Sequence, residues 1–391
     1  MDRGELFVYN TLSRQTERLE EQHVGLYVCG VTPYDTAHLG HAFTYTAFDV
    51  LIRYLRFLGR QVTYVQNVTD IDDDILLRAR STGVNWKELG DREYARFVEE
   101  MRRLNNLPPE VAPRATEHIA DIVRIVEGLL QKGPAYENQG NVYFQVRKYP
   151  QFGRLCRLPY EAQLELANDR GNFPLDPLKR DPLDFVLWQA KKEGEPSWPS
   201  PWGEGRPGWH IECSAMSTRY LGESFAVHGG GEDLIFPHHD AEIAQSESYT
   251  GKPFVRYWMH TGMVYCGQHK MSKSLGNMVF ISELLEKCPA DAVRLCLLVH
   301  HYRQSWDFDA RRLVSTRRLA RTLYRALADC DEASGDDLQR WGGPFLSAMS
   351  DDLNTPRAIA ELAKLAEFGE PSARRAARTL GGRVLGLTFE A

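Results

Sequence analysis

The chain has 391 residues, of which 43% are hydrophobic and 26% are charged, and its formal net charge is −6. These proportions are ordinary for a folded globular protein and exclude collagen, low-complexity sequence and global disorder. The acidic balance argues against a broad DNA-binding surface, although a local basic strip can still contact RNA. A chain of this length predicts two or three domains.

The cysteines and the start of the chain indicate a compartment. Seven cysteines occur at scattered positions, and the first 22 residues are polar and charged rather than apolar like a secretory signal. We therefore expect a cytoplasmic protein whose cysteines are free thiols or metal ligands. No apolar run approaches the roughly 20 residues of a membrane helix, so we expect no membrane partner.

The first 70 residues predict a strand, a helix and a second strand. Gly25–Gly30 is a short apolar run that ends in glycine, which is typical of a buried strand. From Phe43 to Leu55 the apolar residues recur at helical spacing. Gln61–Val68 is rich in β-forming residues and follows Gly59. This order indicates a βαβ unit, and therefore a parallel sheet in an α/β protein.

The rest of the chain divides by composition. Residues 110–200 are rich in proline and charge, while strand-like segments return at 225–228 and 255–260. Beyond Asp291 the pattern is helical and offers no strand candidate. We expect the first half of a sheet domain over 1–109, an inserted connective region over 110–200, the second half of the sheet domain over 201–285, and a C-terminal helical domain over 286–391.

The first chemical motif is His38-Leu39-Gly40-His41, between the first strand and its helix. A phosphate at this position meets free backbone N–H groups and the positive end of the helix. Gly40 lets a flat ring approach the backbone, and two imidazoles one turn apart can donate hydrogen bonds to phosphate. The alternative is a pair of surface histidines at a helix start.

The second motif is Lys270-Met271-Ser272-Lys273-Ser274, followed by Leu-Gly-Asn. Two ammonium groups and two hydroxyls on such a loop suit a flexible clamp on a triphosphate. By itself the run could be a solvated basic loop. Its occurrence with the histidine motif some 230 residues upstream resembles class I aminoacyl-tRNA synthetases.

A third set of residues offers metal ligands. Cys29 lies at the end of the first strand, Cys213 follows a Trp-His-Ile-Glu run, and His238 and Glu242 are four residues apart. On a helix these two side chains point the same way. Two thiols, an imidazole and a carboxylate make a plausible tetrahedral zinc site. The alternative for the cysteines is that they are buried apolar thiols. His239 is taken as a neighbour of the ligand His238.

Long ordered segments carry a close resemblance. The chain resembles the cysteinyl-tRNA synthetase family and its offshoot, the cysteine ligase of mycothiol biosynthesis. The resemblance lies in residues 27–42, 67–73, 179–188, 194–217, 228–248 and 270–277. It implies a Rossmann-like, doubly wound parallel sheet with an insertion and a C-terminal helical bundle.

The resemblance also implies roles for individual residues. The zinc ligands fall on Cys29, Cys213, His238 and Glu242, and the zinc binds the thiol of L-cysteine. Cys29, Thr69 and Trp209 line the amino-acid pocket. ATP binding falls on His38, Gly40, His41, Gly229, Gly230, Gly231, Lys270, Ser272 and Lys273. Of these, His38, His41, Lys270 and Lys273 would assist adenylate formation, with Mg²⁺ on the phosphates.

Two acceptors for the activated cysteine stay open. Four features and the clustered arginines favour the acceptor end of tRNA: Glu242 and the segments 210–217, 244–248 and 299–303. The segments 32–35 and 168–177 and the second histidine of the first motif favour the amine of glucosaminyl-inositol. A non-catalytic relative is the third possibility.

We expect tRNA as the acceptor and a monomer without a separate anticodon-binding domain. The arginines form two groups, at Arg311, Arg312, Arg317, Arg318, Arg321 and Arg325 and at Arg374, Arg375, Arg378 and Arg383. Such groups suit a phosphate backbone, although they could equally be solvated helix faces. Asp74 stands where the synthetases usually carry lysine.

Overall fold

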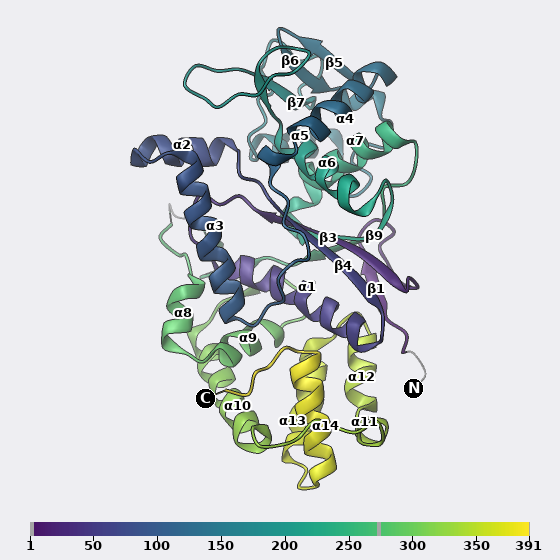
Figure 1. Cartoon of the computed structure of the whole chain (residues 1–391), viewed down its shortest axis with the longest axis vertical. Coiled ribbons are helices and arrows are strands. Elements are labelled where there is room, and N and C mark those ends of the chain that lie inside the picture. Colours follow the sequence, from purple (N-terminus) through teal and green to yellow (C-terminus); the bar gives the residue numbers. More distant parts are fainter. Residues whose placement is uncertain (1–3, 272–274, 391) are drawn as a thin grey trace.

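A parallel sheet of four strands, in the order β10–β9–β3–β4, lies at the centre of this computed structural model, which describes residues 4–271 and 275–390 (Figure 1). Its strands are β3 His23–Val31, β4 Gln61–Val68, β9 Phe225–Gly231 and β10 Val255–Thr261. Helix α1 (Leu39–Phe57) connects the adjacent parallel strands β3 and β4. The predicted βαβ unit and α/β fold class are confirmed.

Alternation along β3 sends its side chains into two different cores. Leu26 and Val28 pack in the cluster that contains the apolar face of α1, whereas Tyr27 and Cys29 pack with residues of α6 (Trp209–Leu221). Successive side chains of a strand point to opposite faces. The thiol of Cys29 is therefore delivered to the face that α6 covers.

The inserted region forms an antiparallel sheet in the order β5–β6–β7–β8, seen at the top of Figure 1. Its elements are η1 Ala115–Glu117, α4 Ile119–Lys132, β5 Ala135–Asn138, β6 Asn141–Phe144, η2 Val146–Lys148, α5 Tyr160–Asn168, β7 Phe185–Ala190 and β8 Gly205–Pro207. Ile122, Phe144 and Trp188 belong to a second core, which the insertion shares with Ile211 and Phe236 of the following segments. Strand β8 lies beyond residue 200, and the expected domain boundaries stay predictions.

The C-terminal part is helical, as predicted, with one exception. Its helices are α8 Ile281–Lys287, α9 Ala290–Leu298, α10 Ala310–Leu327, α11 Gly335–Trp341, α12 Gly343–Ser350, α13 Thr355–Glu367 and α14 Pro371–Arg383. The expectation of no strand beyond Asp291 is wrong at β13 (Trp306–Asp307), which pairs with β11 (Val264–Cys266). Two residues are too few to show alternation, so only the tertiary pairing defines this strand.

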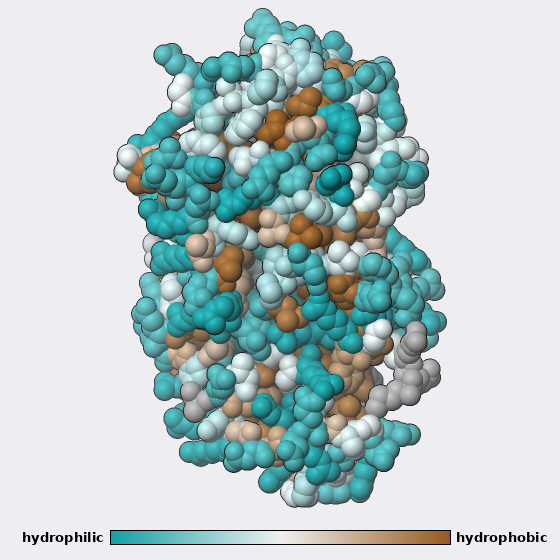
Figure 2. Space-filling view, in the orientation of Figure 1, coloured by the Kyte–Doolittle hydropathy of each residue, from teal (hydrophilic) through white to brown (hydrophobic). Residues whose placement is uncertain are grey.

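The remaining elements surround the central sheet. They are the hairpin β1 Phe7–Asn10 and β2 Gln15–Arg18, the helices α2 Asp73–Thr82 and α3 Trp86–Arg103, the turns η3 Glu232–Leu234 and η4 Ile235–His239, the helix α7 Asp240–Thr250, and β12 His269–Lys270. Among the described residues, no helix is long and apolar enough to cross a membrane. Hydrophilic residues cover most of the face shown in Figure 2.

A buried arginine ties α1, α9 and the C-terminal segment together. Arg294 is 0% exposed and pairs with Asp49 of α1. Its guanidinium also donates to the carbonyls of Leu104 (2.9 Å) and Leu385 (2.5 Å) and to Asn106 (2.6 Å). These carbonyls come from segments far apart in the sequence, so one side chain satisfies backbone groups that the junction would otherwise bury unpaired.

We expect Arg294→Ala to lower the free energy of unfolding by about 3–5 kcal/mol, because it leaves buried carbonyls and the Asp49 carboxylate without this partner. Urea denaturation followed by circular dichroism measures the change. The control is Arg318→Ala on the exposed side of α10, which should change stability by less than about 0.5 kcal/mol. Equal stability of the two variants would contradict this role.

Candidate functional site

The four predicted metal ligands lie together in the interior. The Sγ atoms of Cys29 and Cys213 are 3.9 Å apart, and Cys29 Sγ lies 3.8 Å from Glu242 Oε1. His238 Nε2 lies 3.3 Å from the same carboxylate oxygen. All four residues are buried, and their ligand atoms lie within 4.8 Å of one another.

Four separate elements bring these ligands together. Cys29 comes from β3, Cys213 from the second turn of α6, His238 from η4 and Glu242 from the first turn of α7. The predicted convergence of His238 and Glu242 is confirmed by their ion-pair distance. The convergence of Cys213 with Cys29 depends on the packing of α6 against β3, which local sequence patterns do not show.

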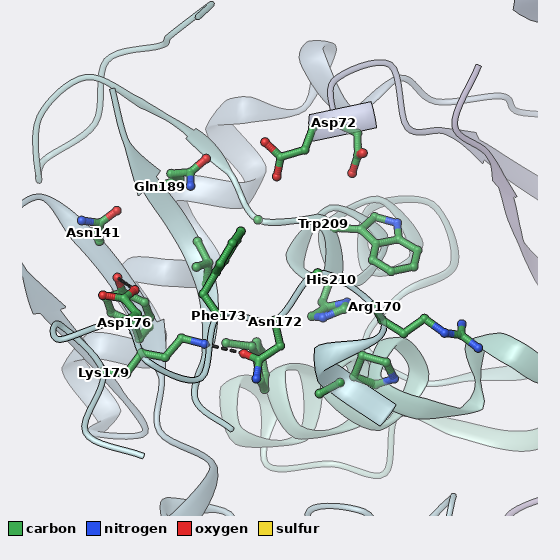
Figure 3. A pocket seen from close by; sticks show the side chains of 18 of the residues that line it. Asp72, Asn141, Arg170, Asn172, Phe173, Asp176, Lys179, Gln189, Trp209 and His210 are labelled. Carbon is green, nitrogen blue, oxygen red and sulfur yellow. Dashed lines mark hydrogen bonds between the residues drawn. The ribbon is translucent and has the colours of Figure 1, made fainter. Parts of the chain in front are cut away.

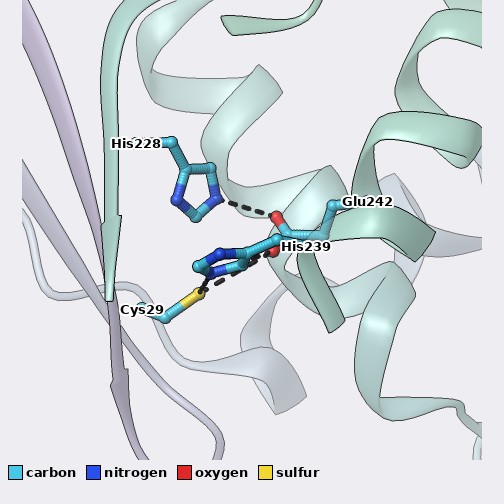
Figure 4. A group of neighbouring side chains, drawn as sticks. All are labelled: Cys29, His228, His239 and Glu242. Atoms are coloured by element: carbon cyan, nitrogen blue, oxygen red, sulfur yellow. Dashed lines mark hydrogen bonds and ion pairs between the residues drawn. The ribbon is translucent and has the colours of Figure 1, made fainter. Parts of the chain in front are cut away.

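Further histidines surround the same atoms (Figure 4). His228 Nε2 lies 3.0 Å from Glu242 Oε2, and His239 Nε2 lies 3.4 Å from Cys29 Sγ. His239 in turn contacts His260, with 2.7 Å between Nδ1 and Nε2. Sequence reasoning treated His239 only as a neighbour and assigned no role to His228 or His260. A second ligand set, with His228 and His239 in place of Cys213 and His238, is therefore also close in space.

Burial disfavours the charged forms of three of these groups. It raises the pKa of the Cys29 thiol well above its usual range and raises that of Glu242, and it lowers the pKa of His238 well below its usual range. A divalent cation reverses this preference, because it stabilises thiolate and carboxylate ligands. Zinc–sulfur bonds of about 2.3 Å place two tetrahedral ligands roughly 3.8 Å apart, so the donor set fits zinc.

The histidine motif caps the N-terminus of α1. His38 Nδ1 accepts a hydrogen bond from the Gly40 N–H (3.1 Å), and His41 Nδ1 accepts one from the His38 N–H (3.3 Å). The two rings stack with centroids 4.0 Å apart. A Cβ on Gly40 would lie 2.9 Å from the His38 ring. Glycine is therefore needed here for the fold of the motif itself.

The capping bonds determine which ring nitrogens can donate. Burial lowers the pKa of His38 to about 3 and that of His41 to about 4, so both rings are neutral at pH 7. Because each Nδ1 accepts a backbone N–H, the proton of each ring lies on Nε2. Both imidazoles can thus donate an Nε2–H to a phosphate oxygen without a protonation step.

The second motif is described only at its start. Lys270 Nζ lies 3.7 Å from Asp233 Oδ2, whereas Ser272 and Lys273 fall outside the described residues. Asp233 also receives a hydrogen bond from Arg170 at its backbone carbonyl (2.6 Å). Asp233, which follows the glycines Gly229–Gly231, therefore contacts both the hairpin of β11 and β12 that carries Lys270 and the inserted region that carries Arg170. In the sequence, Asp233 ends the run Gly-Gly-Gly-Glu-Asp. Its position directly after three glycines is the feature from which a role at the site could have been predicted.

Strand β9 ends in three glycines, and neighbouring side chains approach the backbone at each of them. A Cβ on Gly229 would lie 2.1 Å from the Phe48 ring of α1, and one on Gly230 would lie 3.1 Å from the His239 ring. On Gly231 it would meet the Asp233 carboxylate at 2.5 Å. The contact with the Phe48 ring accounts for Gly229 without a ligand, whereas at Gly230 and Gly231 small shifts of neighbouring side chains would admit a Cβ. The approach of the three glycines to adenosine stays a prediction.

The two predicted pocket residues, Thr69 and Trp209, come from different elements. Trp209 begins α6, and its ring stacks on His238 with centroids 4.4 Å apart. Thr69 follows β4, where its hydroxyl accepts a hydrogen bond from Asn67 (3.2 Å). Asn67 also accepts the N–H of Gly30, the residue after Cys29. Trp209 further lines a cavity of about 1090 Å³ between the insertion and the catalytic part (Figure 3).

Comparison with known proteins decides the family. The family described as tRNA synthetases class I (C) catalytic domain matches residues 15–318, and a DALR domain matches residues 344–368. Cysteine--tRNA ligase of Legionella pneumophila (strain Paris) is 45% identical over 387 residues, which cover 96% of this chain and 83% of that protein. The chain belongs to the cysteinyl-tRNA synthetase family.

Other relatives agree with this assignment. Cysteine--tRNA ligase of Alkalilimnicola ehrlichii is 47% identical over 399 residues, covering 98% of this chain and 85% of that protein. Methionyl-tRNA synthetase of Mycobacterium tuberculosis, in complex with methionyl-adenylate, superposes with a TM-score of 0.66 at 16% identity over 94% of this chain and 89% of that one. At that identity the superposition shows the class I fold alone.

Proposed function

We propose that the protein activates L-cysteine with ATP and transfers the cysteinyl group to tRNA(Cys). The observation that carries this proposal is the convergence of two thiols, an imidazole and a carboxylate in a member of the cysteinyl-tRNA synthetase family. The names of the relatives favour tRNA over an amino-sugar amine as the acceptor. A non-catalytic relative is disfavoured by the intact histidine and lysine motifs.

The activation step needs positioning and charge stabilisation rather than a protein nucleophile. The carboxylate of cysteine attacks the α-phosphorus of ATP, and the bond to the leaving pyrophosphate breaks. The neutral His38 and His41 donate their Nε2–H groups to phosphate oxygens, and Lys270, with the predicted Ser272 and Lys273, neutralises the charge of the leaving group. Mg²⁺ on the phosphates shares this task.

Zinc would be held by Cys29, Cys213, His238 and Glu242. When bound, it selects a thiolate over the hydroxyl of serine, a distinction that size alone supports by only about 1–3 kcal/mol. We prefer this set to the one with His228 and His239 because two thiols suit zinc better. His228 then orients Glu242 through its hydrogen bond, and His239 contacts Cys29.

The tRNA contact is proposed for one face of α10. Arg317, Arg318 and Arg321 are exposed, and no acidic side chain of the described residues lies within ion-pair distance of them. The second arginine group is different, because Arg375 pairs with Asp337 (2.9 Å) and Arg383 pairs with Glu332. Free guanidinium groups are the ones available to a phosphate backbone, so the α10 face is the stronger candidate.

The activation site is tested by cysteine-dependent ATP–pyrophosphate exchange. We expect Lys270→Ala to lower the exchange rate by about 10²–10³, because one charge-stabilising donor is lost. Lys287→Ala, an exposed lysine of α8, is the matched control and should exchange at the parent rate. A Lys270→Ala protein that exchanges as fast as the control would remove this motif from the reaction.

The metal proposal is tested by elemental analysis and amino-acid discrimination. We expect one zinc per chain, and we expect Cys213→Ser to lower both the zinc content and the preference for cysteine over serine in pyrophosphate exchange. Cys330→Ser, a half-buried cysteine after α10, should keep both. If protein freed of zinc by a chelator still prefers cysteine by the same factor, discrimination does not depend on the metal.

The α10 face is tested by the salt dependence of tRNA binding. Replacing Arg317, Arg318 and Arg321 by Ala should weaken binding and flatten the slope of log K against log salt by about 0.9 for each phosphate that the variant no longer neutralises. The triple Lys variant keeps the charge and should keep most of the slope. An unchanged slope in the Ala variant would mean that these arginines form only a solvated face.

A further inference from the structure

A buried carboxylate of the helical part lies where three segments of the chain meet. Asp352 is in the short connection between α12 and α13 and is 4% exposed. Its Oδ1 accepts the N–H of Tyr9 in β1 (2.8 Å) and the O–H of Tyr302 (2.6 Å), and its Oδ2 accepts the Nε–H of Arg303 (2.6 Å). Hydrogen bonds to a charged group are stronger than those between neutral groups. This one carboxylate therefore holds the N-terminal hairpin and the segment after α9 together.

The backbone at this position is strained. Asp352 has a φ of 51° and Leu353 a φ of 52°, in the left-handed region that residues with a Cβ rarely adopt. Two such residues in succession cost free energy, and they persist only where surrounding contacts determine the conformation. The side-chain contacts of Asp352 do so, together with the bond from its N–H to the carbonyl of Phe7 (3.1 Å). Strained backbone of this kind is concentrated at functional positions rather than at ordinary connections between helices.

The segment 299–305, which follows α9 and is held by Asp352, also supports the connection after β10. The carbonyl of Tyr302 accepts the N–H of Gly262 (2.8 Å), and Ser305 Oγ accepts the N–H of Met263 (2.9 Å). A Cβ on Gly262 would lie 2.5 Å from the backbone of the segment 299–305. The two stretches of backbone are therefore in direct contact, and a shift of one displaces the other.

The connection after β10 leads directly to the first lysine of the second motif. Strand β11 begins two residues after Gly262 and pairs with β12, which carries Lys270, and these two strands form the lysine hairpin. On its other side β11 pairs with β13, and Asp307 of β13 accepts the N–H of Gln268 at the turn of the lysine hairpin (3.1 Å). A continuous series of hydrogen bonds therefore runs from Asp352 through the segment 299–307 to the lysine hairpin.

The N-terminal hairpin fixes the other end of this series to the central sheet. Asn10, which follows Tyr9 in β1 and is 3% exposed, hydrogen-bonds the backbone of β10 twice, at 2.9 and 3.1 Å. The guanidinium of Arg303 lies 4.4 Å from the centroid of the Tyr9 ring, where a cation–π interaction adds to the contact. Asp352 therefore relates the lysine hairpin to the sheet that carries the glycine segment 229–231.

We propose that Asp352 is a positioning residue for the activation step, because it fixes the place of Lys270 relative to the central sheet. Asp352 lies outside the predicted ATP and cysteine sites and acts through Tyr302, Arg303 and the lysine hairpin. A displacement of about 1 Å at a reacting centre can lower a rate by about 10²-fold, even when the substitution is distant. The inference rests on the proposed function in taking Lys270 as a group that neutralises the phosphates.

The test is a double-mutant cycle between Asp352 and Lys270, with cysteine-dependent ATP–pyrophosphate exchange as the readout. Asp352→Asn keeps the shape of the side chain and removes its charge. In the parent chain it should lower kcat by about 10- to 100-fold and leave the KM for cysteine unchanged. In the Lys270→Ala chain it should lower kcat by less than about 3-fold, because the group that it positions is already absent. A merely structural role would give the same factor in both chains.

Hydrogen exchange of backbone amides gives a readout that needs no activity. Asp352→Asn should speed exchange in residues 262–268 by about 10-fold, because their hydrogen bonds to the segment 299–307 open more often. Exchange in β3 and β4 should stay at the parent rate. A general loss of stability would instead speed exchange throughout the chain.

Two further variants complete the experiment. Tyr302→Phe removes only the O–H that is donated to Asp352, so it should show the same pattern with smaller factors, and it replaces Asp352→Asn if that variant does not fold. Asp351→Asn makes the same substitution at the exposed neighbouring residue. It should match the parent chain in both pyrophosphate exchange and hydrogen exchange.

Three results would overturn the inference. They are a parent-like kcat in Asp352→Asn, an equal loss of kcat with and without Lys270, or unchanged hydrogen exchange in residues 262–268. A parent chain that shows no cysteine-dependent pyrophosphate exchange would instead contradict the proposed function. In that case the hydrogen exchange would still decide whether Asp352 holds the lysine hairpin in place.

Discussion

The register between β3 and β9 determines the geometry of the site. Tyr27 lies opposite His228 and Val28 opposite Gly229, so Cys29 and the glycine segment leave the sheet at the same edge. The carboxyl ends of parallel strands meet at such an edge, where α/β proteins bind their ligands. This register needs Gly229, because any side chain there would overlap the Phe48 ring that packs α1 on the sheet. The close packing of α1 on the sheet and the position of the ligand cluster therefore both depend on the same register between β3 and β9.

Buried acidic groups occur at two places in the molecule, and their surroundings differ. At the junction with the helical part, Asp49 is paired with Arg294 and Arg53 and accepts the N–H of Leu107. In the ligand cluster the described residues provide no Lys or Arg beside Cys29 and Glu242. Burial raises the pKa of both groups, and Cys213 and Glu242 raise that of Cys29 further. A closed protein-only network stabilises the first location, whereas the second favours an external cation.

Local patterns explain why part of this structure could be predicted from sequence. The βαβ unit has an apolar strand, a helical period and a β-rich segment in succession, and His238 and Glu242 are one helical turn apart. The meeting of Cys213 with Cys29 could not be derived in that way, because it depends on how α6 packs on β3. Asp233 was missed for the same reason, since its role depends on Lys270 and Arg170, which approach from other segments.

The segments proposed for ATP and for tRNA are physically continuous. Strand β13 pairs with β11, and β11 pairs with β12, which carries Lys270. Helix α10, with its exposed arginines, begins at Ala310, directly after β13 and its N-cap Asp309. A substitution on α10 can therefore displace the lysine hairpin through a short, hydrogen-bonded connection. For this reason a loss of tRNA binding identifies an RNA contact only when pyrophosphate exchange, measured on the same variant, stays intact.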